Sequence, residues 1–454
     1  MSSTTYPPMP MQILPPSPTL VHEPSLQEVH ASVQLSATKI GWRRLLGFFG
    51  PGFMIAVGYM DPGNWATDIA GGSRFGYTLL FAIMISNLLA VLLQSLSLKL
   101  GVASEHDLAQ VSREAFGPHI SFVLWIGAEI AIAACDMAEV IGSAIALELL
   151  FHIPLIWGVL ITSADVLVLL LLERWGLRYL EALVITLIGT ILVLFTIQVA
   201  LCHPNHWLAL KSFFIPSPSI ITNPDMLYIA IGILGATVMP HNLYLHSSLA
   251  QSRNYARTFE GKREAIKMGN LDSAFALTVA LLVNGAILIV AAAVFHRSGH
   301  YEVAAIQDAY KLLSPLVGAA GASTLFAVAL LASGQNSSIT GTLAGQVVME
   351  GFMNMKVAPW LRRLITRLLA IVPTIIVVLI TGEEGTEKLL ILSQVILSLQ
   401  LSFAVIPLVL FTGNRKWMGE FANKPWLQRT AWTAAIAIAG MNAWLLVQVA
   451  MGRG

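Results

Sequence analysis

Long apolar runs recur along this chain from about residue 46 to residue 450, and they limit the folds that it can adopt. A run of about 20 apolar residues is long enough to cross the hydrocarbon core of a bilayer as a helix. Only 11% of the residues are charged, whereas a soluble domain has about 25%. So little charge cannot cover the surface of a water-soluble globule of 454 residues. The sequence therefore predicts an all-α protein that crosses a membrane many times.

Eleven segments are predicted to span the membrane, and the first and the sixth are interrupted in the middle. Their approximate ranges are 46–71, 77–100, 119–149, 153–172, 180–201, 227–252, 270–296, 318–348, 364–381, 386–411 and 430–450. The connections are short, so residues 41–454 are expected to form one transmembrane domain. Residues 1–40 contain seven prolines and no apolar run long enough for a span, which predicts a disordered cytoplasmic tail.

Lysine and arginine are distributed unequally between the two sides of the predicted bundle. With the N-terminus in the cytoplasm, only six of the 26 fall on the outer side, namely Arg74, Lys211, Arg297, Lys311, Lys388 and Arg453. Cytoplasmic loops of membrane proteins are rich in these residues. We therefore expect the N-terminus to be cytoplasmic and the C-terminus outside. The expected location of this multi-pass protein is the cell inner (plasma) membrane.

Two of the predicted spans contain helix-breaking residues near their centres. The first contains Asp-Pro-Gly-Asn at Asp61–Asn64, and the sixth contains Met-Pro-His at Met239–His241. Proline removes a backbone donor, so a simple kink is one interpretation of either helix alone. Paired interruptions at corresponding positions of two halves are instead typical of the central binding site of a secondary transporter.

The interruptions carry side chains that could bind a cation. A carboxylate at the centre of a membrane helix costs roughly 2.5–3.5 kcal/mol on insertion scales, so Asp61 needs a partner or a proton. The oxygens of Asp61 and Asn64 would suit Mg²⁺, Ca²⁺ or Mn²⁺. A thioether ligand from Met239 would favour softer transition metals, although core packing is the commoner role of a methionine.

Three acidic residues fall on one predicted face of the third span. Glu129, Asp136 and Glu139 are separated by seven and then three positions, which places them near one side of a helix. One interpretation is structural, with these acids paired to Arg362 and Arg363 at the start of the ninth span. The other is a proton relay, because chains of acids and histidines have that role in transporters.

The DPGN motif at Asp61–Asn64 and the MPH motif at Met239–His241, followed by YLHS, resemble signature motifs of the natural resistance-associated macrophage protein (Nramp) family. This family comprises proton-coupled divalent metal transporters. The resemblance extends from about residue 46 to 450 and includes SGQNSSITGTLAGQVVMEGF (333–352), PWLRRLIT (359–366) and LSQVILSLQ (392–400). The short loops, without outer Asn-x-Ser/Thr sites, are similar to those of the bacterial manganese-importing branch.

The resemblance implies a LeuT-type fold. The first of two inverted repeats of five helices would cover about residues 46–201 and the second about residues 227–411. One extra helix would follow at about 430–450. The metal ligands implied are the side chains of Asp61, Asn64 and Met239, the backbone carbonyls of Gly58 and Ala236, and in some conformations Gln394. The family usually has alanine at the position of Gly58, and a carbonyl ligand survives that difference.

A proton route is implied by the same resemblance. Glu139 and His241 would lie near Asp61, and the route would continue to the cytoplasm through Asp136, Glu129, Arg362 and Arg363. His246 and Arg253 match family positions with a role in gating or in supporting the ligands. The implied function is import of Mn²⁺, with Fe²⁺ and Cd²⁺ as further substrates, by proton-coupled symport with alternating access.

Other functions are weighed against this one. A LeuT-type symporter for Mg²⁺ or a small organic solute is the main alternative, and Met239 and His241 argue against it. A membrane metalloenzyme would need ligand spacing such as HExxH, whereas His241 and His246 are five apart. We expect no enzymatic activity and no resident cofactor, since the metal is substrate and the proton co-substrate. The expected surroundings are the lipid bilayer, without nucleic acid or an obligate protein partner.

Overall fold

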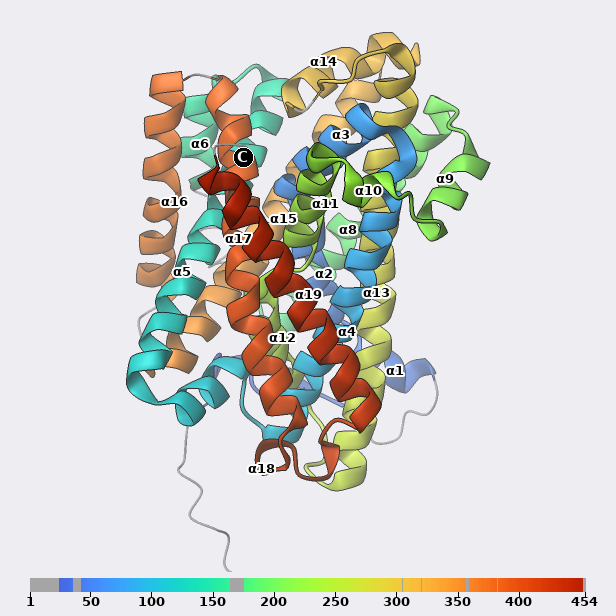
Figure 1. The fold of residues 1–454 in the computed structure, drawn as a ribbon. Helices are drawn as coiled ribbons and strands as arrows, with labels where there is room; N and C mark the ends of the chain where they lie inside the picture. Colours follow the sequence, from blue (N-terminus) through green and yellow to red (C-terminus); the bar gives the residue numbers. More distant parts are fainter. Residues whose placement is uncertain are drawn as a thin grey trace, which may run out of the picture.

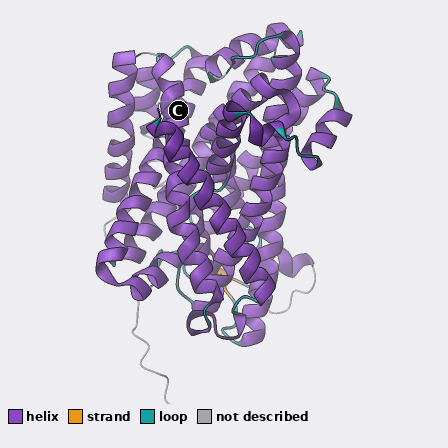
Figure 2. Ribbon diagram, in the orientation of Figure 1, coloured by secondary structure: helices purple, strands orange, loops and turns teal. Residues whose placement is uncertain are grey.

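The computed structural model of the chain describes residues 24–35, 42–163, 175–303, 305–319, 321–355, 359–381 and 383–451. Most of these residues are helical, and the long helices run between two ends of a bundle (Figures 1 and 2). Helix α14 (Ile306–Val317) lies at one end and α18 (Arg415–Met418) at the other. We call these the α14 end and the α18 end. The distribution of basic residues predicts that the α18 end is cytoplasmic.

Each predicted span coincides with helix in the described part of the chain. The first five correspond to α2 (Pro51–Ala56) with α3 (Pro62–Phe75), α4 (Leu80–Ser104), α5 (Leu108–Phe151), α6 (Leu155–Ser163) and α8 (Leu177–Cys202). The others correspond to α11 (Pro224–Thr237) with α12 (Pro240–Leu249), α13 (Phe259–Val294), α15 (Ala322–Met353), α16 (Pro359–Thr381), α17 (Glu383–Gly413) and α19 (Pro425–Ala450). Residues 164–172 of the fourth predicted span lie outside the described ranges.

Shorter elements connect the long helices. They are α1 (Trp42–Phe48), α9 (His206–Phe214), α10 (Ser219–Thr222), and the 3₁₀ turns η1 (Val57–Met60), η2 (Gly76–Leu79), η3 (Ala250–Ser252), η4 (His296–Ser298) and η5 (Gly419–Phe421). The helix α5 begins earlier than predicted, at Leu108, because Gly117 turns the chain with φ 75° and separates a first short segment from the span. Glycine adopts this positive φ without the steric cost that a Cβ would bring.

Both predicted interruptions are present. The first span passes from α2 through η1 to Asp61, whose backbone is extended, and α3 then begins at Pro62. The sixth span leaves its helix at Val238 and Met239, and α12 begins at Pro240. In both places proline occupies the first helical position, where its missing N–H has no intrahelical partner to lose. The prediction of two broken helices is therefore confirmed.

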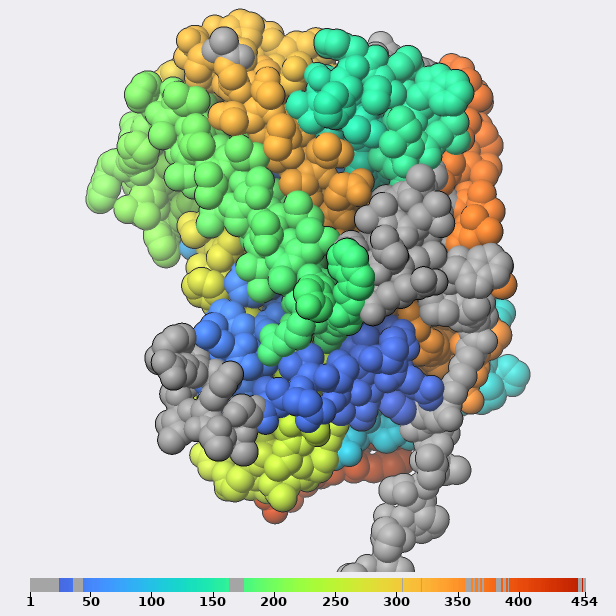
Figure 3. Space-filling model, turned by 180° about the vertical axis from the view of Figure 1, so that it is seen from behind, coloured from blue at the N-terminus to red at the C-terminus, as the bar shows by residue number. Residues whose placement is uncertain are grey.

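The two broken helices are packed among long neighbours. Helix α13 contacts α2, α3 and α4, while α15 contacts α5 and α8, and α12 lies against α4 and α15. Seen from behind, the blue residues of α1 and α2 lie between green α8 and the yellow start of α13 (Figure 3). This packing puts the interrupted segments inside the bundle, away from lipid.

Residues 24–35 differ from the predicted disordered tail. They form turns and a short strand, β1 (Val33–Gln34), which pairs in parallel with β2 (Arg253–Asn254) after α12. Leu26 and Val33 are buried. Polar, proline-rich composition predicted disorder, but a strand partner some 220 positions away is not visible in local composition. The rest of the predicted tail lies outside the described residues.

Candidate functional site

The carboxylate of Asp61 organises the first interruption. Its Oδ1 accepts hydrogen bonds from the backbone N–H of Asn64 at 2.9 Å and from Asn64 Nδ2 at 2.5 Å. Asp61 is the N-cap residue of α3, and an acidic N-cap accepts from the third helical residue in this way. The Asp-Pro-Gly-Asn sequence thus starts a helix inside the membrane while presenting a carboxylate there.

Backbone carbonyls from both interruptions converge on the same place. Asn64 Nδ2 lies 3.4 Å from the carbonyl oxygen of Gly58 and 2.9 Å from that of Ala236. Together with Asp61 Oδ1, three oxygens from two broken helices surround one amide NH₂ group, which carries partial positive charge. A cation that displaced this NH₂ group would meet the same three oxygens.

Gln394 of α17 flanks this group of oxygens. A Cβ added to Gly63 would overlap Gln394 Nε2 and lie 3.0 Å from Asp61 Oδ2, so the two side chains meet at that glycine. Within the described residues, neither Asp61 Oδ2 nor Gln394 Oε1 has a hydrogen bond of normal geometry. Buried oxygens without donors are expected where a cation is to be held.

Met239 is fully buried at the second interruption. Its side chain packs with Ala131 and Cys135 of α5 and with Leu397 of α17. Its sulfur lies 3.2 Å from the point where a Cβ on Gly58 would stand. The thioether is therefore beside the Gly58 backbone, on the side of the oxygen cluster that faces α5.

Gly58 is held tightly by a residue that sequence reasoning missed. A Cβ at position 58 would overlap Nδ2 of Asn242 and lie 3.2 Å from its Cγ. Asn242, three residues after Met239, is fully buried, and its Nδ2 makes a long contact of 3.5 Å with the carbonyl of Ile55. Asn242 therefore occupies the space that an alanine side chain at position 58 would need.

The acids of α5 are partly brought together. A Cβ on Gly341 of α15 would lie 3.0 Å from Asp136 Oδ1 and 3.3 Å from Glu139 Oε1, so both buried carboxyl groups face that glycine. Glu129 is half-buried and accepts a hydrogen bond of 3.0 Å from Trp125 Nε1. The side chains of Arg362 and Arg363 lie outside the described part of the chain.

Cys135 connects the acids to the second interruption. Its Sγ lies 3.6 Å from Glu139 Oε1, in hydrogen-bond geometry, and its side chain also packs against Met239. Cys135 therefore lies between Glu139, one of the three predicted acids of this helix, and Met239.

The two histidines of α12 have different surroundings. Both rings are buried, and His241 Nδ1 has no hydrogen-bond partner among the described residues. His246 instead uses both ring nitrogens, Nδ1 with Gln94 Oε1 at 2.9 Å and Nε2 with Ser273 Oγ at 3.2 Å. Gln94 in turn donates to the Tyr59 hydroxyl at 2.9 Å. His246 is thus tied to the residue that follows Gly58.

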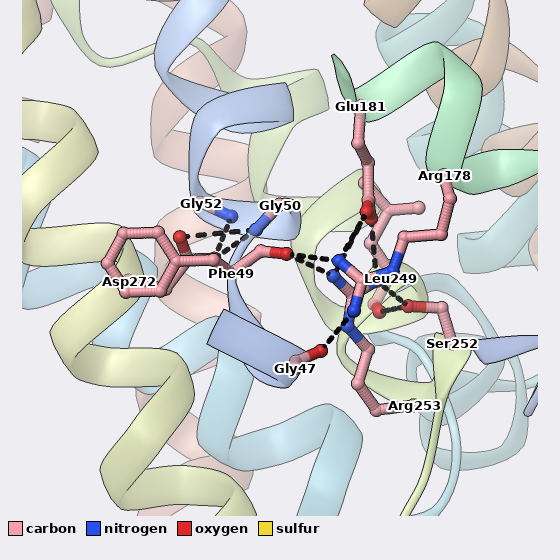
Figure 4. Close-up of polar contacts among 10 residues, drawn as sticks. All are labelled: Gly47, Phe49, Gly50, Gly52, Arg178, Glu181, Leu249, Ser252, Arg253 and Asp272. Carbon is pink, nitrogen blue, oxygen red and sulfur yellow. Dashed lines mark hydrogen bonds and ion pairs between the residues drawn. The ribbon is translucent and has the colours of Figure 1, made fainter. Parts of the chain in front are cut away.

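Arg253 begins the short strand β2, which lies toward the α18 end (Figure 2), and Figure 4 shows its contacts. Its guanidinium forms an ion pair with Glu181 of α8 at 2.6 Å, and both side chains are at most 3% exposed. Arg253 Nη2 also donates to the Phe49 carbonyl at 2.6 Å. The pair therefore joins the chain after α12 to α8 and to the start of the first span.

Two further charged residues complete this network (Figure 4). Arg178 donates to the carbonyls of Phe49 at 2.8 Å and Gly47 at 2.6 Å. Asp272 of α13 accepts from the Gly52 N–H at 2.7 Å and so caps α2. Sequence reasoning missed Glu181 and Asp272, although an acid inside a predicted span is a visible signal.

Asp68 is another acid inside a predicted span that sequence reasoning missed. It lies seven residues after Asp61 on α3 and is buried, and its Oδ2 has no hydrogen-bond partner in the described ranges. The same signal as for Glu181 and Asp272, a carboxyl group in an apolar run, would have found it.

A cavity of about 340 Å³ extends from Gln394, which flanks the oxygen cluster, toward the α14 end. Gln394 and Thr67 line its inner part, while Arg74, Tyr301 and Glu302 line its outer part. The α18 end, by contrast, is held together by the buried Arg253–Glu181 pair. The cavity therefore reaches Gln394 beside the oxygen cluster, while Asp61 and Asn64 themselves are at most 1% exposed.

Known proteins resemble this chain over nearly its whole length. The family described as natural resistance-associated macrophage protein-like matches residues 52–448. A protein of Nostoc sp. named divalent metal cation transporter MntH is 60% identical over 431 residues, which are 95% of this chain and 97% of that relative. A protein with the same name from Bradyrhizobium diazoefficiens is 57% identical over 428 residues, covering 94% and 95%.

Solved structures agree with these relatives. A manganese transporter of Eremococcus coleocola, in complex with an aromatic bis-isothiourea substituted compound, is 42% identical with a TM-score of 0.88, covering 94% of this chain and 90% of that one. Mhp1, a nucleobase-cation-symport-1 family transporter, has a TM-score of 0.59 at 13% identity, covering 91% and 95%. The second likeness concerns the fold alone. The predicted LeuT-type fold is confirmed.

Proposed function

Because this chain belongs to the Nramp family, we propose that it imports Mn²⁺, with Fe²⁺ and Cd²⁺ as further substrates, by proton-coupled alternating access. The protein is a multi-pass membrane transporter of divalent metal ions. Its class is transport and not enzymatic catalysis, and the metal is cargo and not a resident cofactor. The proposed location is the plasma membrane, with the α18 end and the N-terminus in the cytoplasm and the C-terminus outside.

The observation that carries this proposal is the convergence of oxygens on the Asn64 amide. Asp61 Oδ1 and the carbonyls of Gly58 and Ala236 lie within 2.5 to 3.4 Å of one nitrogen. Replacing that NH₂ group by a divalent ion would leave all three oxygens satisfied. The Asn64 oxygen, Met239 and Gln394 are the proposed additional ligands. A mixed set of oxygen and thioether ligands suits Mn²⁺, Fe²⁺ and Cd²⁺ better than Mg²⁺ or Ca²⁺.

Proton coupling follows from the need for an ionised Asp61 when metal binds. A carboxyl group in an apolar site prefers its neutral form, and a metal ligand must be deprotonated, so metal binding releases a proton. The proposed acceptors are Glu139 and His241, which flank the interruptions. Asp136, Glu129, Arg362 and Arg363 are proposed to continue the route, while His246 and Arg253 support the moving helices.

Alternating access gives the cavity and the Arg253 network complementary roles. Metal would enter through the cavity from the α14 end while the buried ion pair keeps the α18 end closed. Release on the other side would require the start of the first span to separate from α8, which breaks the contacts of Phe49 with Arg253 and Arg178. Moving one half of a repeat fold around a fixed central site is the general mode of such transporters.

Uptake of Mn²⁺ into proteoliposomes, with and without an inward pH gradient, tests this function. Asp61→Asn should abolish saturable uptake, because the remaining amide cannot neutralise the ion or take up a proton. Asp308→Asn, which removes an exposed acid of α14, is the matched control and should transport normally. Uptake by Asp61→Asn at the control rate would contradict the assignment. Uptake of Mg²⁺ or an organic solute in place of Mn²⁺ would favour the alternative symporter.

A further inference from the structure

Residues Pro24–Leu35 form a strap across the α18 end of the bundle. We propose that this strap is a latch that keeps the α18 end closed and must detach before metal leaves on that side. The proposal rests on transport by alternating access, and it assigns a regulatory role to a segment outside the membrane-spanning repeats.

One end of the strap is bound to the segment that carries Arg253. Strand β1 pairs Val33 with Arg253 and Gln34 with Asn254. The Asn254 amide donates to Gln34 Oε1 at 2.8 Å, and the Ala31 N–H donates to the Gln251 carbonyl at 3.0 Å. The strap thus holds the backbone of Arg253, whose side chain forms the ion pair with Glu181.

The other end of the strap is anchored on α15. Leu26 is only 1% exposed, and its N–H donates to Glu350 Oε2 at 3.0 Å. Glu28 accepts from Gln346 Nε2 at 3.1 Å, and the same amide bonds to Glu350 at 2.9 Å. One buried leucine and two polar contacts therefore connect the strap to the end of a helix that packs against α5 and α8.

Leu35 completes the closure beside the first span. Its Cδ2 lies 3.0 Å from the position of a Cβ on Gly47 of α1. It packs on a cluster that includes Phe48, Ala250 and Tyr255. The strap consequently contacts α1, the segment that follows α12 and the end of α15 at once. Inward opening separates elements of this kind, so the strap opposes it.

The backbone of the strap favours release as well as binding. Leu26 has φ 55° and Ala31 has φ 50°. Residues with a Cβ adopt this left-handed region at a steric cost. The contacts of the bound strap compensate for that cost, and detachment relieves it. A segment held by a few contacts against local strain is suited to reversible binding.

A reversible cross-link gives the sharpest test. Gln34→Cys with Asn254→Cys places two cysteines at paired strand positions, where a disulfide can form. In proteoliposomes, oxidation should stop Mn²⁺ uptake and a reductant should restore it, while each single variant transports under both conditions. Calorimetry of the oxidised protein should still show Mn²⁺ binding. If the fully cross-linked protein transported Mn²⁺ as fast as the protein after reduction, the proposed latch would be overturned.

The binding measurement separates the latch from the proposed function. If neither the oxidised nor the reduced protein binds Mn²⁺, the proposed function fails. If both bind Mn²⁺ and both transport it, the latch alone fails.

Release of the strap should have the opposite effect. A Leu249→Cys reporter is fully buried at the end of α12, so its reaction with N-ethylmaleimide measures opening of the α18 end. Labelling of the chain without the reporter, whose Cys135 and Cys202 are buried, supplies the background. Leu26→Asp should raise the labelling rate about tenfold, equivalent to about 1.4 kcal/mol.

Two further variants keep this second test decisive. Gln27→Asp introduces the same charge at an exposed neighbour and should not change labelling. Val33→Pro disturbs the strand pair and leaves Leu26 in place, so it should also raise the labelling rate even if Leu26→Asp folds poorly. Equal labelling of Val33→Pro and Gln27→Asp would overturn the proposal.

Discussion

The contact between Gly58 and Asn242 predicts a specific result for Gly58→Ala. The added methyl group would overlap Asn242 Nδ2 and approach Met239 Sδ to 3.2 Å. Both neighbours are fully buried, so the strain must be taken up by side chains or by the interrupted backbone. Overpacking of this kind costs about 1–3 kcal/mol. Since Gly58 supplies a proposed carbonyl ligand and Met239 a proposed thioether, we expect the strain to weaken metal binding.

A double-mutant cycle can separate the loss of Mn²⁺ affinity from a general loss of stability. A strain of about 1.4 kcal/mol at the ligands corresponds to a tenfold loss of Mn²⁺ affinity. Asn242→Ala alone should change affinity little, because its contact with the Ile55 carbonyl is long, at 3.5 Å. Gly58→Ala with Asn242→Ala should recover most of the loss, since truncation of the amide makes room for the methyl group.

Isothermal titration with Mn²⁺ measures the four proteins of the cycle, and thermal unfolding in detergent provides the control for folding. A coupling energy above about 0.5 kcal/mol would show that the two positions interact through their fit. Binding of Mn²⁺ by Gly58→Ala as tightly as by the parent would show that the added methyl group causes no strain at the ligands. A double variant that binds no better than Gly58→Ala would show that Asn242 is not the source of the strain.

Substitutions at two other positions address selectivity and stability. Met239→Ala should reduce Cd²⁺ uptake more than Mn²⁺ uptake and let Ca²⁺ or Mg²⁺ compete, because the thioether disfavours hard ions. Met54→Ala, at another buried methionine, is the control. Superimposed competition curves of Met239→Ala and the parent would show that Met239 only packs in the core. Asp107, the N-cap of α5, accepts from the N–H groups of Ala109 and Gln110 at 2.9 Å, so Asp107→Ala should cost about 1 kcal/mol of stability. Burial raises the pKa of Asp107 to about 6, so the folded protein should lose stability as this carboxyl group ionises between about pH 4 and 6. Asp107→Asn should keep the cap without that loss. Identical pH profiles of thermal unfolding in detergent for the two proteins would contradict this.

Much of the fold is readable in the chain because membrane insertion depends on local properties. Apolar runs of the length of a bilayer predict spans without knowledge of their neighbours. Proline at positions 62 and 240 predicts where a helix must restart, and the structure places both at the first helical position. Asp61 and Met239 were conspicuous for the same reason, since each lies beside such a restart within an apolar segment.

The limits of sequence reasoning are clearest at the strap. Its composition predicts disorder, yet Leu26 is buried and Val33 pairs with Arg253. No periodicity links these residues, because the pairing depends on where the end of α12 lies in the folded bundle. Glu181 could have been noticed as an acid in an apolar span, but its pairing with Arg253 could not.

The membrane class, the two interruptions and the types of side chain available for a metal can all be read from the sequence. These depend on hydrophobicity, helix-breaking residues and ligand chemistry, which are properties of short segments. Tertiary structure alone decided that the Gly58 and Ala236 carbonyls meet at the Asn64 amide. It also decided that Asn242 fills the space beside Gly58. Such contacts arise when helices distant in sequence pack at a particular depth and rotation, and no local pattern encodes that geometry.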